Sequence, residues 1–267
     1  MPGVPVAAMA RRLLPVLRPL LLAMALTLVV SACAGATGSD DTPDGEVVVF
    51  AAASLAEGFT AVGEAFRGKH PTVGVRFSFA GSDTLSRQVV EGAPADVLAS
   101  ADPVQMAAVE AAGSLAAPPS VFARNVLAIA VEPGNPLGIS GLADLGEPGL
   151  LLALAGEEVP AGAYARSALE AAGVTVRPAT REPDVRAAMS KVVLGEADAA
   201  IVYASDVAAA AGRVAGVAIP PEHNVSAAYL IARLDGAPNP RGARAFVDFV
   251  LGAEARDILA EHGFLRP

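Results

Sequence analysis

"FAGSDTLSRQVVEGAPADVLASAD", residues 79–102, contains a strand end, a helix and a second strand in 24 residues. The residues before it, 73–79, alternate as in a strand, and from Ser82 onward the apolar residues recur at helical spacing. "ADVLAS" (95–100) predicts the next strand, and Asp102 is placed to cap a further helix. Gly81 and small polar residues form the first junction, so Ser82 is a candidate helix cap, nucleophile or ligand.

Strand patterns and helix patterns continue to alternate through the rest of the 267-residue chain. Short β-branched runs alternate with stretches that carry apolar residues every three or four positions, which predicts strands between helices. We expect strands at 46–53, 73–79, 95–100, 125–131, 150–155, 174–179, 198–205 and within 214–234, and helices at 54–70, 82–92, 102–113, 162–173, 183–197 and within 239–264.

Strands that alternate with helices indicate an α/β fold with mostly parallel sheets and helices on both faces. The length suits two small lobes, connected by the strands Asn125–Val131 and Ala227–Leu234. We expect lobe 1 to comprise 46–124 plus 229–267, and lobe 2 to comprise 125–228. A ligand cleft should lie between the lobes, because ligands of such sheets bind at the carboxyl ends of the strands.

The N-terminus has the features of a secretory signal peptide. Three arginines precede the apolar run Leu20–Val30, which is too short to span a bilayer of about 30 Å. Val30-Ser31-Ala32-Cys33 matches the bacterial lipobox, so we expect a lipoprotein signal peptide over 1–32 and a lipid on Cys33. The small, polar and acidic residues 33–45 predict a flexible tether. The expected location is the cell membrane, lipid-anchored, on the periplasmic or extracellular side.

Charge and cysteine content exclude several classes of protein. Without the three arginines of the signal segment, the chain carries 16 basic and 28 acidic residues, a net charge of −12. Binding to nucleic acid through a basic surface is therefore not expected. Cys33 is the only cysteine, so no disulfide can form within the chain, and no His/Cys cluster predicts a site for a free metal cation. A bound anion would have to be held by local donors.

Four junctions before predicted helices share such donors. They lie at Ser54, Ser82, Ala161 and Val185, and each begins a helix with small residues. First-turn N–H groups lack partners within the helix and carry the positive end of its dipole. Several of them directed at one point would bind an anion without a lysine or arginine. The two serines add hydroxyl donors.

Each junction also has a simpler interpretation. A serine before a helix is most often an N-cap, and such a cap contributes about 1 kcal/mol. A serine nucleophile would need a base and a motif such as G-x-S-x-G, which the chain lacks. The three histidines lie away from the junctions in sequence, at His70, His223 and His262. We therefore expect no catalytic residue, with a serine-dependent hydrolase as the least favoured alternative.

Taken together, the motifs form an ordered set: "VFAAASL" (49–55), "FAGSDTLSRQVVEGAPADVLASAD" (79–102), "VPAGAYARSAL" (159–169), "DVRAAMSKVVLGEADAAIVYASD" (184–206) and "FVDFVLGAEARDILAEHGF" (246–264). From about Glu46 to Phe264, the chain resembles the molybdate-binding proteins of ABC importers, which have the type II periplasmic-binding-protein fold. The resemblance implies capture of molybdate or tungstate, delivery to an ABC permease, no cofactor, and a monomer.

The resemblance also implies which residues bind the oxyanion. Ser54 and Ser82 would give hydroxyl and backbone N–H donors from the first lobe. Ala161 and Val185 would give backbone N–H donors from the second lobe, and Tyr203 would give its phenol. Arg87, Arg166 and Arg186 follow three of the junctions and are not expected to be ligands.

Asp83 departs from the family pattern, which commonly has a serine after Ser82. A carboxylate there would either repel a dianion or accept the proton of hydrogen phosphate, or it would point away and stabilise its own helix. A receptor for sulfate or phosphate therefore remains the alternative function. Similar ionic size leaves the choice between molybdate and tungstate open.

Overall fold

The computed structural model describes residues 43–267. The predicted signal peptide, Cys33 and most of the predicted tether lie outside the described residues. Within 43–267, no helix is both long and apolar enough to cross a membrane.

The first sheet has five strands in the order β2-β1-β3-β10-β4. β1 pairs in parallel with β2 and β3, whereas β10 is antiparallel to both β3 and β4. Four strands therefore run in one direction, and β10 alone runs against them. The strands are β1 Gly45–Ala52, β2 Val73–Ala80, β3 Val97–Ser100, β4 Ser120–Asn125 and β10 Ala227–Arg233.

The second sheet repeats this plan with the order β7-β6-β8-β5-β9. β6 pairs in parallel with β7 and β8, and β5 is antiparallel to β8 and β9. In each sheet, the reversed strand is the one that the chain enters directly from the other sheet: β10 after β9, and β5 after β4. The strands are β5 Leu127–Val131, β6 Leu152–Ala155, β7 Thr180–Glu182, β8 Ala199–Tyr203 and β9 Ala215–Ala218.

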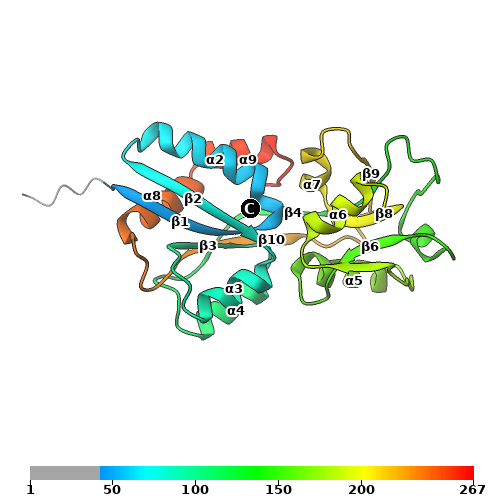
Figure 1. Ribbon diagram of the computed structural model, residues 1–267, viewed down its shortest axis with the longest axis horizontal. Coiled ribbons are helices and arrows are strands. Elements are labelled where there is room, and N and C mark those ends of the chain that lie inside the picture. The colour runs from blue at the N-terminus through cyan, green and yellow to red at the C-terminus, as the bar shows by residue number, and fades with distance from the viewer. Residues whose placement is uncertain (1–42) are drawn as a thin grey trace, which may run out of the picture. The chain divides into compact units, whose positions relative to one another are not determined.

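Helices cover both faces of both sheets (Figure 1). In the first half, α2, α8 and α9 lie on one face of the sheet and α3 and α4 on the other; in the second half, α6 and α7 lie opposite α5. Below, the first half means the first sheet with η3, α2, α3, α4, α8 and α9, and the second half means the second sheet with η4, α5, α6 and α7. The helices are η3 Ala53–Leu55, α2 Ala56–Lys69, α3 Ser82–Val90, α4 Pro103–Ala111, η4 Leu142–Gly146, α5 Pro160–Ala171, α6 Val185–Val193, α7 Ala204–Ala209, α8 Pro240–Val250 and α9 Ala253–Glu261.

Aromatic rings fill the space between α2 and the first sheet. Phe59 is fully buried and lies 5.5 Å from Phe122 on β4 and 6.1 Å from Phe246 on α8, between ring centroids. Phe66, two turns further along α2, meets Phe246 edge to face at 5.3 Å. The apolar spacing that predicted the helix at 54–70 thus marks the face that packs against the core.

Three local predictions were wrong. The strand expected at 125–131 is two strands in different sheets, with the break at Val126. Side-chain amides take over there: Asn125 Oδ1 accepts from Val126 N–H, and Asn224 bonds both the N–H and the carbonyl of Leu127. The strand expected at 174–179 is a connection. The strand that pairs with the four-residue β6 follows it, at Thr180–Glu182. The end of the strand expected at 198–205 begins α7.

Gly162 in α5 is required by a close approach of the backbone. A Cβ atom at this position would lie 1.9 Å from the carbonyl oxygen of Gly156 and 2.5 Å from that of Ala155. Gly68 in α2 is the opposite case, because a Cβ atom there would meet nothing within 4 Å.

We predict that Gly162→Ala lowers the free energy of unfolding by about 3 kcal/mol, because the backbone must shift to admit the methyl group. Gly68→Ala is the matched control and should raise it by roughly 0.5–1 kcal/mol, the usual gain for alanine in a helix. Urea unfolding followed by circular dichroism measures both. Equal stability of Gly162→Ala and the wild type would contradict the prediction.

Candidate functional site

A pocket lies where elements of the two halves meet. All five residues predicted to bind an oxyanion line it: Ser54, Ser82, Ala161, Val185 and Tyr203. The tertiary structure therefore brings together residues that are as far apart as 149 positions in the chain. The other lining residues are Ala52, Ala53, Gly81, Ala101, Val159, Pro160 and Asp184.

In the first half, both serines follow the carboxyl ends of neighbouring parallel strands. β1 ends at Ala52 and leads into η3, which contains Ser54. β2 ends at Ala80, and α3 begins at Ser82 after Gly81. Since β1 and β2 pair in parallel with Ala52 opposite Ala80, the two junctions meet at one edge of the sheet.

Neither serine caps its helix through its side chain, contrary to the simpler interpretation. Ser82 is the first residue of α3, Gly81 occupies the N-cap position, and no side-chain cap bond forms. The N–H of Ala101 donates to Ser82 Oγ at 3.0 Å, which leaves the hydroxyl proton of Ser82 free for another acceptor. Ser54 Oγ lies 2.8 Å from Tyr229 Oη, and either oxygen can be the donor.

In the second half, the helix starts leave backbone donors free. α5 has Val159 at its N-cap, which provides no side-chain cap, and Pro160 has no N–H, so Ala161 carries the first free N–H. At α6, Asp184 Oδ1 accepts from the N–H groups of Arg186 and Ala187, both at 2.9 Å. That cap leaves the N–H of Val185 without a partner at the start of the helix.

Tyr203 provides the clearest sign of a missing ligand. Its side chain is 1% exposed and lines the pocket, yet its phenol oxygen has no hydrogen-bond partner among the described residues. A buried hydroxyl without a partner costs free energy that a bound acceptor would recover. Burial raises the pKa of Tyr203 well above its ordinary value of 10.0, and the nearby Tyr229 adds to the shift. The phenol therefore keeps its proton and can donate at neutral pH.

Charged side chains lie around the pocket without supplying a cation to its wall. Arg87 and Arg166 are exposed, and Arg166 pairs with Glu170 at 3.3 Å. Arg186 forms an ion pair with Glu57. None of the three arginines is among the lining residues, as expected for side chains that are not ligands. The carboxylate that does line the wall is Asp184, whose Oδ1 serves α6.

Asp83 does not line the pocket. Its Oδ2 accepts from the hydroxyl of Thr84 at 3.1 Å, while its buried Oδ1 has no partner within residues 43–267. Oδ1 lies on the side of Gly81, where an added Cβ atom would come within 2.5 Å of it.

The histidines lie elsewhere, and within residues 43–267 none of them bonds Ser54 or Ser82. His70 stacks on Phe66 with 4.5 Å between ring centroids, and His262 Nδ1 bonds the carbonyl of Ile258 at 2.8 Å. His223 lies in the turn before β10, and none of the three lines the pocket. In the part of the chain that the structure describes, no group of three or more His, Cys, Asp or Glu side chains is arranged to hold a metal ion.

Sequence reasoning missed Tyr229, Ala101 and Asp184. Tyr229 is fully buried and orients Ser54 from a residue 175 positions away. Its alternation within β10 predicts only that it faces the core, so no sequence signal identifies its partner. Asp184 could have been found, because an aspartate directly before a predicted helix is a common N-cap.

Comparisons with known proteins identify the family of this chain. Residues 47–265 match the model of the family described as bacterial extracellular solute-binding protein. The molybdate-binding protein ModA of Mycobacterium tuberculosis H37Rv is 43% identical over 221 residues, which are 83% of this chain and 85% of that protein. A sulfate-binding protein of Synechococcus elongatus is 27% identical over 281 residues, covering 91% of this chain and 80% of that protein.

The solved structures confirm the predicted fold. The periplasmic molybdate-binding protein of Azotobacter vinelandii superposes with a TM-score of 0.73 at 20% identity, covering 83% of this chain and 99% of that chain. The likeness confirms the predicted two-lobed α/β fold of a periplasmic binding protein. With a family model matched over nearly all the described residues, the chain belongs to the family of bacterial extracellular solute-binding proteins.

Proposed function

We propose that the protein captures molybdate outside the cytoplasm and delivers it to an ABC permease. The observation that carries the proposal is the buried phenol of Tyr203, which has no partner and lines the same pocket as the donors of four helix starts. The 43% identity to a protein named as molybdate-binding supports the choice of ligand.

The proposed site binds its ligand with neutral donors. Molybdate is a dianion at neutral pH and only accepts hydrogen bonds, so N–H and O–H groups match it on every side. Ser54 and Ser82 would donate from the first half, and Ala161, Val185 and Tyr203 from the second. The positive ends of the helix dipoles add to the attraction. Specificity over sulfate would come from pocket size, and tungstate, which is similar in size to molybdate, should bind as well.

Capture would proceed by closure of two lobes. We assign 46–124 plus 229–267 to one lobe and 125–228 to the other, because the reversed strands β5 and β10 each connect to the opposite sheet. The hinge would lie at the two connections, near Val126 and between β9 and β10. The protein would act as a monomer and carry out no catalysis.

A phosphate receptor would depend on Asp184. Hydrogen phosphate needs an acceptor for its proton, and Asp83 does not line the pocket. Asp184 does line it, and because two backbone N–H groups donate to its Oδ1, hydrogen phosphate would have to use Oδ2. Sulfate remains the stronger competitor, because it presents the same charge and geometry as molybdate.

We predict that a competition titration ranks molybdate and tungstate well above sulfate and phosphate. Isothermal titration calorimetry of the full chain in detergent, at one pH and ionic strength, measures all four affinities. Binding of sulfate or phosphate that is tighter than binding of molybdate would refute the proposed ligand while leaving an oxyanion receptor in place.

We predict that Tyr203→Phe weakens molybdate binding by about 1.5–3 kcal/mol, because a charge-assisted hydrogen bond is lost. Tyr164→Phe is the matched control: it removes a phenol from α5 that does not line the pocket, and affinity should stay unchanged. Calorimetry gives both values. If Tyr203→Phe bound molybdate as well as the wild type, the phenol would not be a ligand.

Ser54→Ala and Ser82→Ala should each weaken binding by a similar amount, about 1.5–3 kcal/mol. Ser82→Ala also removes the acceptor for Ala101 N–H, so its unfolding must be measured in parallel with its affinity. Unchanged affinity in both folded variants would remove the serines from the site.

Membrane attachment rests on Cys33. We propose that this residue carries the lipid anchor and holds the protein on the outer side of the cell membrane, as the lipobox predicts. Cys33→Ala should move the protein from the membrane fraction to the soluble fraction and abolish incorporation of labelled fatty acid. Retention of the label in Cys33→Ala would disprove the assignment.

A further inference from the structure

The donor residues of the pocket are almost fully buried in this structure, which we take as the closed form. The five donor residues are at most 5% exposed: Ser54 5%, Ser82 2%, Ala161 2%, Val185 3% and Tyr203 1%. Because donors this buried leave an ion little room to pass, we expect the two halves to separate for each binding and release. Every contact between the halves near the pocket must break at that step.

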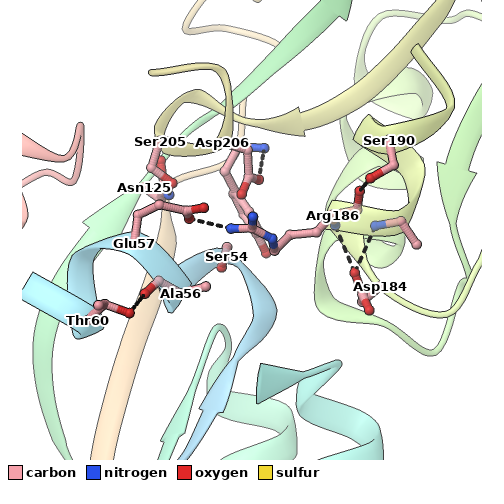
Figure 2. A network of polar contacts seen from close by, with 12 residues as sticks. Ser54, Ala56, Glu57, Thr60, Asn125, Asp184, Arg186, Ser190, Ser205 and Asp206 are labelled. Carbon is pink, nitrogen blue, oxygen red and sulfur yellow. Dashed lines mark hydrogen bonds and ion pairs between the residues drawn. The ribbon is translucent and has the colours of Figure 1, made fainter. Parts of the chain in front are cut away.

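Several contacts join the halves around the pocket, and three of them lie between the helix starts that carry the donors or their neighbours. Gly81 lies so close to the second half that a Cβ atom there would be 2.9 Å from the carbonyl oxygen of Pro183. Gln105 Nε2 donates to the carbonyl of Glu158 at 3.4 Å. The third contact is charged, between Glu57 on α2 and Arg186 on α6 (Figure 2).

The charged contact adjoins the pocket donors. Glu57 stands three residues after Ser54, in the first turn of α2, and Arg186 directly follows Val185. The pair thus connects the element that carries a first-half donor to the helix that carries a second-half donor. Both side chains are about one-third exposed, at 39% for Glu57 and 31% for Arg186.

Each member of this pair stabilises the ionised form of the other. Burial alone would raise the pKa of Glu57, but its hydrogen bond with Arg186 and the charge of Arg186 outweigh burial and hold that pKa below its ordinary value. The hydrogen bond to Glu57 raises the pKa of Arg186. Both groups are therefore ionised at neutral pH.

A second carboxylate lies in reach of the charge of Arg186, on the same half of the protein. Asp206 in α7 is 1% exposed, and its Oδ2 accepts from Tyr203 N–H at 3.0 Å. Its Oδ1 has no hydrogen-bond partner among residues 43–267. Asp206 and Arg186 interact electrostatically, and Figure 2 shows Asp206 near the guanidinium end of the Arg186 side chain. A buried carboxylate oxygen without a partner is costly unless a cation or donor reaches it in another state.

We propose that Arg186 exchanges carboxylates as the protein opens and closes, pairing with Glu57 in the closed form and with Asp206 in the open form. Arg186 is then a positioning residue: it touches no ligand, and it sets how long the closed pocket persists. Pairing with a carboxylate in both forms also keeps its charge out of the pocket wall. The inference deepens the proposed function and rests on it for the identity of the ligand.

Two measurements test the exchange in the full chain. The first is the release rate of bound radiolabelled molybdate after a chase with excess unlabelled molybdate, at pH 8. The second is hydrogen exchange of the ligand-free protein over α3 and α6, which reports opening of the pocket whether or not molybdate is the ligand. Burial raises the pKa of Asp206 to about 7, so this side chain is mostly ionised at pH 8.

Opposite effects are expected for the two carboxylates. Glu57→Gln should speed molybdate release and pocket exchange by about tenfold, because the closed form loses a charge-assisted hydrogen bond. Asp206→Asn should slow both, since the open form loses its acceptor. Arg186→Gln should remove the difference, so that adding Glu57→Gln to it changes neither rate.

Arg166→Gln is the control, because it breaks an exposed ion pair within α5 and should leave both rates unchanged. If Asp206→Asn does not fold, as judged by its circular dichroism, Asp206→Ser replaces it. Wild-type rates in folded Glu57→Gln, or faster release in the Asp206 variant, would overturn the exchange. Failure of the wild type to bind molybdate, with the expected order of hydrogen exchange intact, would instead refute the proposed function and keep the exchange.

Discussion

Hydrogen bonding to a desolvated anion is the constraint that the proposed oxyanion site must satisfy. The chain is acidic, and the pocket wall includes no basic side chain, so the field of the protein opposes an anion. Fixed N–H and O–H donors can replace the water that such an ion loses, because they need no reorganisation when it arrives. The free N–H groups of Ala161 and Val185, the hydroxyl proton of Ser82 and the phenol of Tyr203 are such donors.

The topology explains how these donors come to one place. Both sheets have the same plan, with a reversed strand in the fourth position, and the carboxyl ends of β1 and β2 lead to the same pocket as those of β6 and β7. Each of these strand ends leads into a helix, whose first turn carries unpaired donors. The reversed strands β10 and β5 connect the halves, which makes the pocket a boundary that opening can expose.

A second set of residues holds the donors in position. Tyr229 bonds the hydroxyl of Ser54, Ala101 N–H bonds that of Ser82, and Asp184 occupies the two N–H groups that follow Val185. Each bond occupies one polar group of a donor residue or of its helix, and a second polar group, a hydroxyl proton or a backbone N–H, stays free to donate into the pocket. Next to these residues, the ion pair of Glu57 and Arg186 joins the elements that carry Ser54 and Val185. The proposed opening of the halves would therefore break a contact that adjoins the proposed ligand donors.

Local patterns in the chain were enough to predict the α/β class and the four helix starts. Strand and helix periods, glycine turns and N-caps depend on residues only a few positions apart, and the sequence states them directly. Tyr203 came from the family resemblance, not from such a pattern. The helix α7 was missed although the bond from Tyr203 N–H to Asp206 at its start is local. The break at Val126 was missed because the side chain of the distant Asn224 completes the backbone bonding of Leu127 there. The partners of the donors were beyond prediction for the same reason: Tyr229 is 175 positions from Ser54, and Arg186 is 129 positions from Glu57. Only folding brings such residues into contact, and it therefore decided which hydroxyls and N–H groups remain free to bind.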